Sequence, residues 1–397
     1  MIELHLKIIL TILLVLYALF EWNLRVYRRF SSKPLAAYPK VSVLVPCRNE
    51  EKRLEANLLS LFAQDYPDFE VLVLDDNSTD ATPEILKKLS AAHPRLRVLT
   101  GQPLPAGWQG KNFACHQLSE QASGEWLLFV DADTAHAPGM LKAAVQEAVD
   151  RKAAVVSTFP RQVFHSAGDE LTVPLMFFVL LSFLPMFFTD KKIPVARGAF
   201  ATGCGQFFLV RRDAYRAVGG HAAVGARISE APLLAGRVKS AGYKIVLADG
   251  SRWVSCRMYE GWAATYRGFS RSVFASMGGS VAALLFFITV QTYVFHGPWV
   301  LLAAAMVGSA GAIGEPAAQI PDASSLFTPE VNLLFAGCFL LPVWMRWRIH
   351  RRTGMSVRWI WAHAVSIALY HVILVSSFLQ YRIFKNTSWK GRAYAAP

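Results

Sequence analysis

The sequence VSVLVPCRNE at residues 41–50 decides the fold. Its first half is an apolar, β-branched run that is typical of a buried strand, and polar residues begin directly after Pro46. From Leu54 to Phe62, apolar residues recur at three- and four-residue intervals, which indicates a helix. A buried strand followed at once by a helix is the first unit of an α/β domain.

The same alternation continues along the chain. Runs typical of strands at 69–74, 96–99 and 126–130 alternate with helical patterns at 85–89 and 111–121. This order predicts an α/β fold with a mainly parallel sheet flanked by helices, and its site is expected at the carboxyl ends of the strands. Polar side chains follow three of the strands, in CRNE (47–50), DDNS (75–78) and DAD (131–133).

Apolar residues concentrate at the two ends of the 397-residue chain. The pattern predicts an N-terminal transmembrane anchor at 1–30 and a catalytic domain at 38–255. An interfacial gating segment at 256–279, C-terminal transmembrane helices at 280–382 and a basic tail at 383–397 are expected to follow. Within the domain, 171–188 is expected to form helices that lie on the bilayer surface. Residues 280–314 are expected to be one tilted span or a tight pair, and 333–347 and 357–381 are further candidate spans.

The net charge of +13 fits a membrane surface better than a nucleic acid. Arginines gather just after the first apolar segment and again at 346–352, and no nucleic-acid-binding motif is present, so nucleic acid is excluded as a partner. This placement predicts a multi-pass protein of the inner cell membrane with a cytoplasmic catalytic domain. The five cysteines form no C-x-x-C pair, which agrees with a reducing compartment.

Three motifs carry chemistry, and each has a structural alternative. Asp131-Ala132-Asp133 offers oxygen ligands for Mg²⁺ or Mn²⁺, but the same pattern also forms ordinary strand-end turns. The pair Asp75-Asp76 fits either a nucleotide-binding edge or a helix cap. Lys111 follows Gly110 at a helix start, where charge and helix dipole favour phosphate, although an exposed loop lysine would look the same.

Together, these motifs resemble family 2 glycosyltransferases with the GT-A fold. VLVPCRNE (43–50), LDDNSTD (74–80), GWQGK (107–111) and FVDADT (129–134) have the order and spacing of that family over residues 40–255. MYEG (258–261), RGFSR (267–271) and the tail WKGR (389–392) are similar to its membrane branch that glycosylates carotenoid acids or hopanoid-type lipids.

The resemblance implies a metal-dependent, inverting, single transfer from a UDP-sugar to a membrane lipid of the carotenoid-acid, hopanoid or polyprenyl type. It also implies roles for individual residues. The donor would be bound by Asn49, Glu50, Asp75, Asp76, Lys111 and Asp131, the metal by Asp133, and the acceptor side would be formed by Gly203, Gly205, Trp262, Arg267 and Arg271. The segment that contains Trp262, Arg267 and Arg271 has an alternative interpretation, as an interfacial helix without a catalytic role.

The sequence departs from the family at the catalytic base. Family members usually have a Glu-Asp pair at a helix start, and here Glu230 is followed by Ala231. Either Glu230 is the base, or the acceptor is a carboxylic acid that is already ionised at pH 7 and needs none. A third interpretation is that Glu230 only caps its helix.

Two other functions remain open from the sequence. A processive polysaccharide synthase would carry Gln-x-x-Arg-Trp, and none of the three Arg-Trp pairs has a glutamine at that spacing. A catalytically inactive membrane scaffold is supported by Ala231 alone, and the intact Asp76, Lys111, Asp131 and Asp133 argue against it.

Overall fold

The apolar runs predicted as strands form one half of a seven-stranded sheet with the order β3-β2-β1-β4-β8-β6-β9. The first four strands are parallel, whereas β8 lies antiparallel between β4 and β6. The strands are β1 (Val41–Cys47), β2 (Phe69–Asp75), β3 (Leu96–Thr100), β4 (Trp126–Val130), β6 (Val155–Ser157), β8 (Phe207–Arg211) and β9 (Ile245–Leu247). The predicted mainly parallel α/β fold is confirmed.

The computed structural model describes residues 1–30, 35–189, 198–311, 327–384, 386–389 and 392–395. Helices pack on both faces of the sheet, because alternate side chains of its strands belong to two separate apolar cores. These helices are α2 (Leu54–Phe62), α3 (Thr82–Ala92), α4 (Gly110–Gln121), α5 (Met140–Asp150), α8 (Arg212–Ala217) and α9 (Glu230–Ser240). All five cysteines are buried and unpaired.

A small second sheet extends from the main one just after the DAD motif. Its strands are β5 (Thr134–His136), β10 (Val254–Cys256) and β7 (Arg161–Gln162), in the order β5-β10-β7. Cys256 pairs with Thr134 in the antiparallel register of β10 and β5. This pairing brings the segment after Cys256 beside the acidic motif at the end of β4, although more than 120 residues separate them in the sequence.

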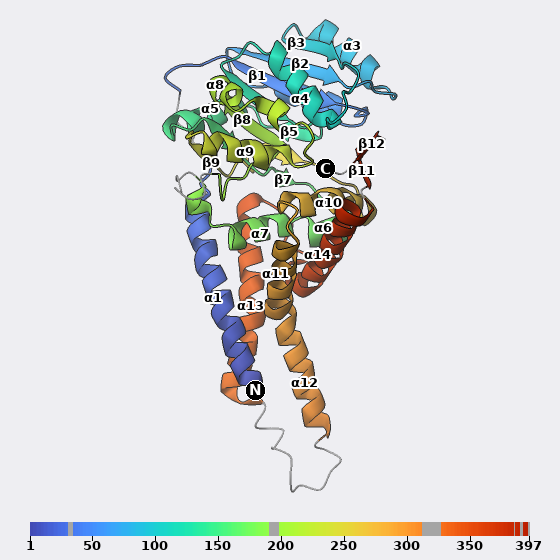
Figure 1. The fold of residues 1–397 in the computed structure, drawn as a ribbon. Helices are drawn as coiled ribbons and strands as arrows, with labels where there is room; N and C mark the ends of the chain where they lie inside the picture. The colour runs from blue at the N-terminus through green and yellow to red at the C-terminus, as the bar shows by residue number, and fades with distance from the viewer. Residues whose placement is uncertain (31–34, 190–197, 312–326, 385, 390–391, 396–397) are drawn as a thin grey trace.

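Long helices project from one side of the domain, and the N-terminus lies at their far end (Figure 1). They are α1 (Ile2–Val26), α11 (Val281–Gln291), α12 (Gly297–Gly311) and α13 (Pro329–Thr353). A π-helical turn at Thr292–His296 joins α11 to α12, so the region predicted as one span or a pair is one continuous helix as far as it is described. Helix α14 (His363–Phe378) lies obliquely beside α10 and α11 (Figure 1).

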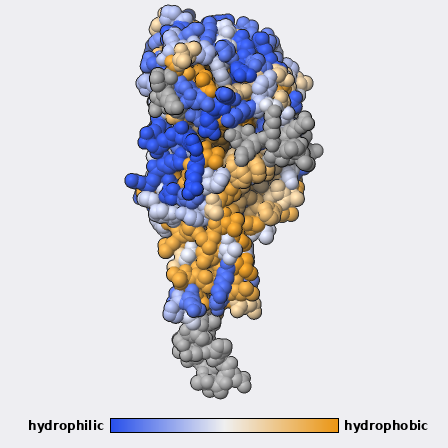
Figure 2. Space-filling view, turned by 90° about the vertical axis from the view of Figure 1, so that its left-hand side faces the viewer, coloured by the Kyte–Doolittle hydropathy of each residue, from blue (hydrophilic) through white to orange (hydrophobic). Residues whose placement is uncertain are grey.

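Three described helices are long and apolar enough to cross a membrane: Ile2–Val26, Val281–Val307 and Ile360–Ile383. The predicted span at 333–347 lies within α13, which is not one of the three because polar and basic residues border its apolar stretch on both sides. The helical half of the surface is hydrophobic where the domain is hydrophilic (Figure 2). The protein is therefore a membrane-associated one.

Short helices lie across the boundary between the domain and the long helices (Figure 1). They are α6 (Ala167–Thr172), α7 (Leu175–Phe183), a 3-10 turn at Met186–Phe188 and α10 (Trp262–Ser276). The side-chain amide of Asn23 in α1 donates hydrogen bonds to the carbonyls of Leu181 (2.8 Å) and Leu184 (2.6 Å). This buried amide fixes α7 against α1, and the apolar stretch at 171–188, which was predicted to lie on the bilayer surface, is partly enclosed by the protein.

The C-terminal residues form a two-stranded ribbon, β11 (Asn386–Trp389) and β12 (Arg392–Ala395), where a basic tail was predicted. Five of the tail's residues lie outside the described residues: Lys385, Lys390, Gly391, Ala396 and Pro397.

Candidate active site

A three-residue ionic cluster lies where the strand ends of the sheet meet the start of two helices. Lys111 stands in the first turn of α4, Asp131 directly follows β4, and Glu230 is the first residue of α9. The Nζ atom of Lys111 lies 2.7 Å from Asp131 Oδ1 and 3.1 Å from Glu230 Oε1. The sequence predicted each of the three separately, and the structure brings them into contact.

The cluster keeps Glu230 ionised. Burial on its own would raise the pKa of this carboxyl, but the ammonium of Lys111, together with a backbone hydrogen bond and His221, outweighs it, and the net pKa is lowered. Glu230 also occupies the start of a helix, where the helix dipole favours a negative charge. Glu230 is therefore a carboxylate near neutral pH, ready to accept a proton or a hydrogen bond.

Asp133 stands apart from the cluster in an environment that disfavours its charge. Burial, together with the negative charges of Asp131 and Glu50, raises its pKa to about 7, and Arg53 at 3.9 Å offsets this only in part. Its Oδ1 atom is buried and has no hydrogen-bond partner in the part of the chain that the structure describes. An orphaned buried carboxylate oxygen beside other carboxylates is what a divalent cation would complete.

The donor set fits a cation that is shared with a ligand. Among the described residues, no group of three or more His, Cys, Asp and Glu side chains forms a complete metal cage. Mg²⁺ and Mn²⁺ in phosphate-handling sites usually take one or two carboxylates and complete their coordination with phosphate oxygens and water. Asp133 and the neighbouring Asp131 could supply that protein share.

The other acidic strand end is built differently. The carboxylate of Asp75 accepts a 3.0 Å hydrogen bond from the backbone N–H of Ser78, so it closes a turn directly after β2. Asn49 has a left-handed backbone (φ 53°), and its side-chain oxygen accepts a hydrogen bond from the Thr79 N–H. Asp76 is 3% exposed, and Glu50 alone of these predicted donor-binding residues lines the main cavity.

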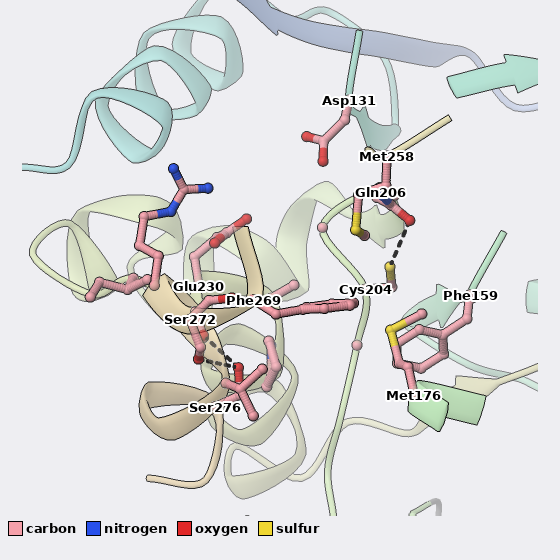
Figure 3. A pocket seen from close by; sticks show the side chains of 18 of the residues that line it. Asp131, Phe159, Met176, Cys204, Gln206, Glu230, Met258, Phe269, Ser272 and Ser276 are labelled. Carbon is pink, nitrogen blue, oxygen red and sulfur yellow. Dashed lines mark hydrogen bonds between the residues drawn. The ribbon is translucent and has the colours of Figure 1, made fainter. Parts of the chain in front are cut away.

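That cavity has a volume of about 820 Å³ and two chemically different ends. Asp131 and Glu230 lie at one end, and Phe159 and Met176 at the other (Figure 3). Helix α7 supplies most of the apolar wall, which Phe269 and Val273 of α10 and Tyr370 of α14 complete. The apolar end therefore borders one of the helices that are suited to a membrane, since Tyr370 belongs to the candidate span Ile360–Ile383.

The two glycines predicted on the acceptor side, Gly203 and Gly205, lie in close packing that a side chain would disturb. A Cβ atom on Gly203 would lie 2.9 Å from the ring of Phe208, and one on Gly205 would lie 2.7 Å from Glu230 Oε1 and 2.9 Å from Lys111 Nζ. Gly205 thus lets the backbone approach the ionic cluster.

Replacing Gly205 by alanine is expected to lower kcat/KM by about a hundredfold, because the added methyl displaces Glu230 and Lys111 by about an ångström. Steady-state nucleotide release measures the effect. Gly236→Ala is the matched control: it lies inside α9, and its Cβ would meet only ordinary contacts at 3.7 Å. Equal activity of the Gly205→Ala and Gly236→Ala enzymes would show that the cluster tolerates displacement.

The three predicted gating residues separate in the structure. Arg271 lines the cavity, whereas Trp262 packs against Gly168 of α6, and Arg267 is exposed and does not line the cavity. The sequence missed Arg53, Met258 and the apolar wall from α7. The one available signal for that wall was the apolar stretch at 171–188, which was interpreted only as a membrane-surface helix.

Comparisons with known proteins identify the family and the fold of the domain. Residues 42–219 match the model of glycosyl transferase family 2. A 4,4'-diaponeurosporenoate glycosyltransferase from Staphylococcus aureus (strain USA300) is 24% identical over 362 residues, which cover 89% of this chain and 88% of that protein. The solved structure of the mannosyltransferase PcManGT from Pyrobaculum calidifontis, in complex with GDP-Man and Mn²⁺, has a TM-score of 0.54 at 20% identity and covers 94% of this chain and 99% of its own. Its fold is GT-A, and so is the fold described above.

Proposed function

Because residues 42–219 form a family 2 glycosyltransferase domain with the GT-A fold, we propose that this enzyme transfers one sugar from a UDP-sugar to a membrane lipid. The observation that carries the proposal is the single cavity whose one end is ionic and whose other end is apolar and faces the membrane-suited helices. A water-soluble, diphosphate-bearing donor fits the first end, and a lipid tail fits the second.

The donor is assigned to the polar end. Lys111, at the start of α4, would contact the diphosphate, since both its ammonium and the helix N-terminus favour negative charge. Asp131 and Glu50 would hold the nucleotide, and the turn made by Asn49, Asp75 and Asp76 would form the base and ribose side. A divalent cation held by Asp133 would neutralise charge on the departing diphosphate.

At the moment of transfer, the acceptor oxygen bonds to the anomeric carbon of the sugar as the bond to the diphosphate breaks, with inversion. An alcohol acceptor must lose its proton, and Glu230, with its lowered pKa, would take it. A carboxylic acid acceptor has no proton to lose at pH 7 and would form a sugar ester. Two observations favour the acid: Ala231 replaces the second carboxylate, and the Staphylococcus relative is named for a carboxylate, diaponeurosporenoate.

The competing functions lack such support. A polymer would need a channel through the helices, and the cavity lined by α7, α10 and α14 suits one lipid chain instead. A catalytically inactive scaffold has no physical need for a buried Lys111–Asp131–Glu230 cluster that desolvates three charges. The basic residues at the domain ends of α1 and α13 favour a domain on the cytoplasmic face of the inner membrane, in a multi-pass arrangement.

Nucleotide release from purified full-length enzyme tests the proposal. UDP-glucose, UDP-N-acetylglucosamine and GDP-mannose are offered in detergent with Mn²⁺, with and without a bacterial lipid extract. We expect release from one UDP-sugar that rises at least about tenfold with lipid and stops when the metal is chelated. A product carrying one sugar by mass spectrometry is expected, whereas long polymers or binding without release would contradict the proposal.

The acceptor class has its own test at Ala231, which is buried at the cavity wall. Ala231→Asp places a second carboxylate beside Glu230, and we expect it to lower turnover of a carotenoid or fatty acid at least about tenfold through like-charge repulsion. Ala231→Asn has nearly the same size without the charge and is the matched control. Faster turnover of an acid acceptor by Ala231→Asp would contradict the ester hypothesis and leave the donor assignment intact.

A further inference from the structure

A second concave site lies at the boundary between the domain and the long helices and shares no residue with the main cavity. It has a volume of about 640 Å³ and lies where the domain ends of α1 and α13 come together. Five of its seven lining residues are arginines. The complete lining is Leu24, Arg28, Arg29, Trp347, Arg348, Arg351 and Arg352.

Positive charge exceeds negative charge at this groove. Arg348 pairs with Glu21 at 2.8 Å and Arg352 with the buried Asp249 at 2.8 Å, while Arg29 reaches Asp249 only at 4.0 Å. Two carboxylates therefore face five guanidinium groups. Arg28 and Arg351 are exposed and form no ion pair with any described residue.

The position of the groove along α1 and α13 indicates which part of a membrane it would contact. Trp344 and Trp347 stack at 4.8 Å one to two turns before Arg351, and Trp22 is exposed at the corresponding height on α1. Exposed tryptophans mark the interface between lipid tails and headgroups. The arginines thus stand at the height of the headgroups, and α1 is one of the helices suited to cross the bilayer.

We propose that the groove formed by Arg28, Arg29 and Arg351 with the ion-paired Arg348 and Arg352 binds the phosphate of an anionic phospholipid headgroup. Guanidinium groups bind phosphate oxygens in pairs, and Trp347, under Arg351 at 5.9 Å, supplies a flat apolar wall for the adjoining glycerol and chain. The site anchors the domain against an acidic membrane surface and takes no part in sugar transfer.

Native mass spectrometry of the full-length protein in detergent tests this proposal with phosphatidylglycerol and phosphatidylcholine as probes. We expect wild type to bind phosphatidylglycerol at least about tenfold more tightly, and Arg28→Gln/Arg29→Gln/Arg351→Gln to lose that preference, since each basic residue near an anionic surface contributes roughly fivefold. The control Lys87→Gln/Lys88→Gln/Arg95→Gln removes the same charge from the end of the domain that carries α3, away from the long helices (Figure 1). We expect this control to retain the preference for phosphatidylglycerol.

Equal binding of both lipids by wild type, or an unchanged preference in the groove variant, overturns the proposal. Inorganic phosphate is the second arm. Displacement of phosphatidylglycerol by phosphate at a comparable concentration would make the groove a site for free phosphate and would equally overturn it. Thermal unfolding verifies that the triple variant is folded. If it is not, Arg351→Gln alone and the loss of wild-type preference in high salt give the same decision.

Discussion

Replacing Lys111 by methionine is expected to lower kcat/KM by about a thousandfold with every nucleotide sugar. The ammonium of Lys111 bridges Asp131 and Glu230 at 2.7 and 3.1 Å, and by our proposal it also faces the donor diphosphate. Methionine preserves the length and apolar stem of the side chain, so the loss measures the charge. Steady-state release of the nucleotide at saturating metal is the measurement.

The same substitution is expected to change the pH profile. Lys111 is the main group that lowers the pKa of Glu230, so without it the burial of this carboxyl is opposed only by weaker interactions and its pKa rises. The acid limb of kcat/KM, which reports the essential base, should then move to higher pH in Lys111→Met. If Glu230 only caps its helix, the limb stays where it is while the rate still falls.

Stability should fall as well, but modestly. Removing one partner of a buried pair costs several kcal/mol, and the side chains here are 10 to 26% exposed, so we expect about 2 kcal/mol. Lys111→Arg keeps the charge and is the control: it should recover most of the stability and part of the rate. A Lys111→Met enzyme with normal kcat/KM would remove the ionic cluster from the mechanism.

Replacing Asp133 by asparagine is expected to abolish turnover, by at least about a thousandfold, and yet to stabilise the metal-free fold. The activity is lost because asparagine cannot supply the carboxylate charge that a divalent cation requires. The stability is gained because Asp133 has a raised pKa, about 7 against an ordinary value of 3.8.

The sign follows from proton binding. A carboxyl whose pKa is higher in the folded state binds its proton more tightly there, so the folded state loses stability as pH rises from about 4 to about 7. At about 1.4 kcal/mol per pKa unit, the loss at pH 8 is at most about 4 kcal/mol. Asp133→Asn has no such loss, so its Tm in a chelator should exceed that of wild type at pH 8, and the difference should shrink at pH 4.

Addition of Mn²⁺ should reverse the order of the two Tm values at pH 8. It is expected to raise the Tm of wild type at pH 8 and to leave that of Asp133→Asn unchanged, since binding to the folded state alone stabilises it. Asp68→Asn, an exposed carboxylate away from the cavity, is the control and should behave like wild type. A lower Tm for Asp133→Asn at pH 8, or a Mn²⁺ response that survives it, would contradict the metal assignment.

The sequence singled out five residues that line the polar end of the cavity, because local signals mark them, and their roles stay predictions: Glu50, Lys111, Asp131, Asp133 and Glu230. Apolar runs such as 126–130 end abruptly at acidic residues, and parallel strands put such ends on one edge of the sheet. The contact between Lys111 and Glu230 was not predictable in this way. It depends on β8 entering the sheet antiparallel, after a long connection through α6 and α7 whose direction no local pattern sets.

The residues of the apolar end were also not predictable from the sequence, and the reason is different. Helix α7 is hydrophobic on every side, so its sequence has no polar stripe to indicate which residues face the cavity. The structure turns Met176 and Phe183 toward the cavity and buries Phe177 and Phe178 against the long helices. Asp75 shows the opposite difficulty: a turn-closing carboxylate and a ligand-binding one have the same sequence signature.

The position of the apolar wall has a consequence for how this enzyme encounters its acceptor. By our proposal the acceptor is a membrane lipid, and because α7, α10 and α14 line that wall beside the helices suited to the bilayer, it would enter from the bilayer without passing through water. Its encounter rate then depends on its mole fraction in the membrane, in two dimensions, and not on its amount per volume of solution. Expansion of the bilayer with inert lipid would dilute the acceptor, although the number of acceptor molecules in the cell had not changed.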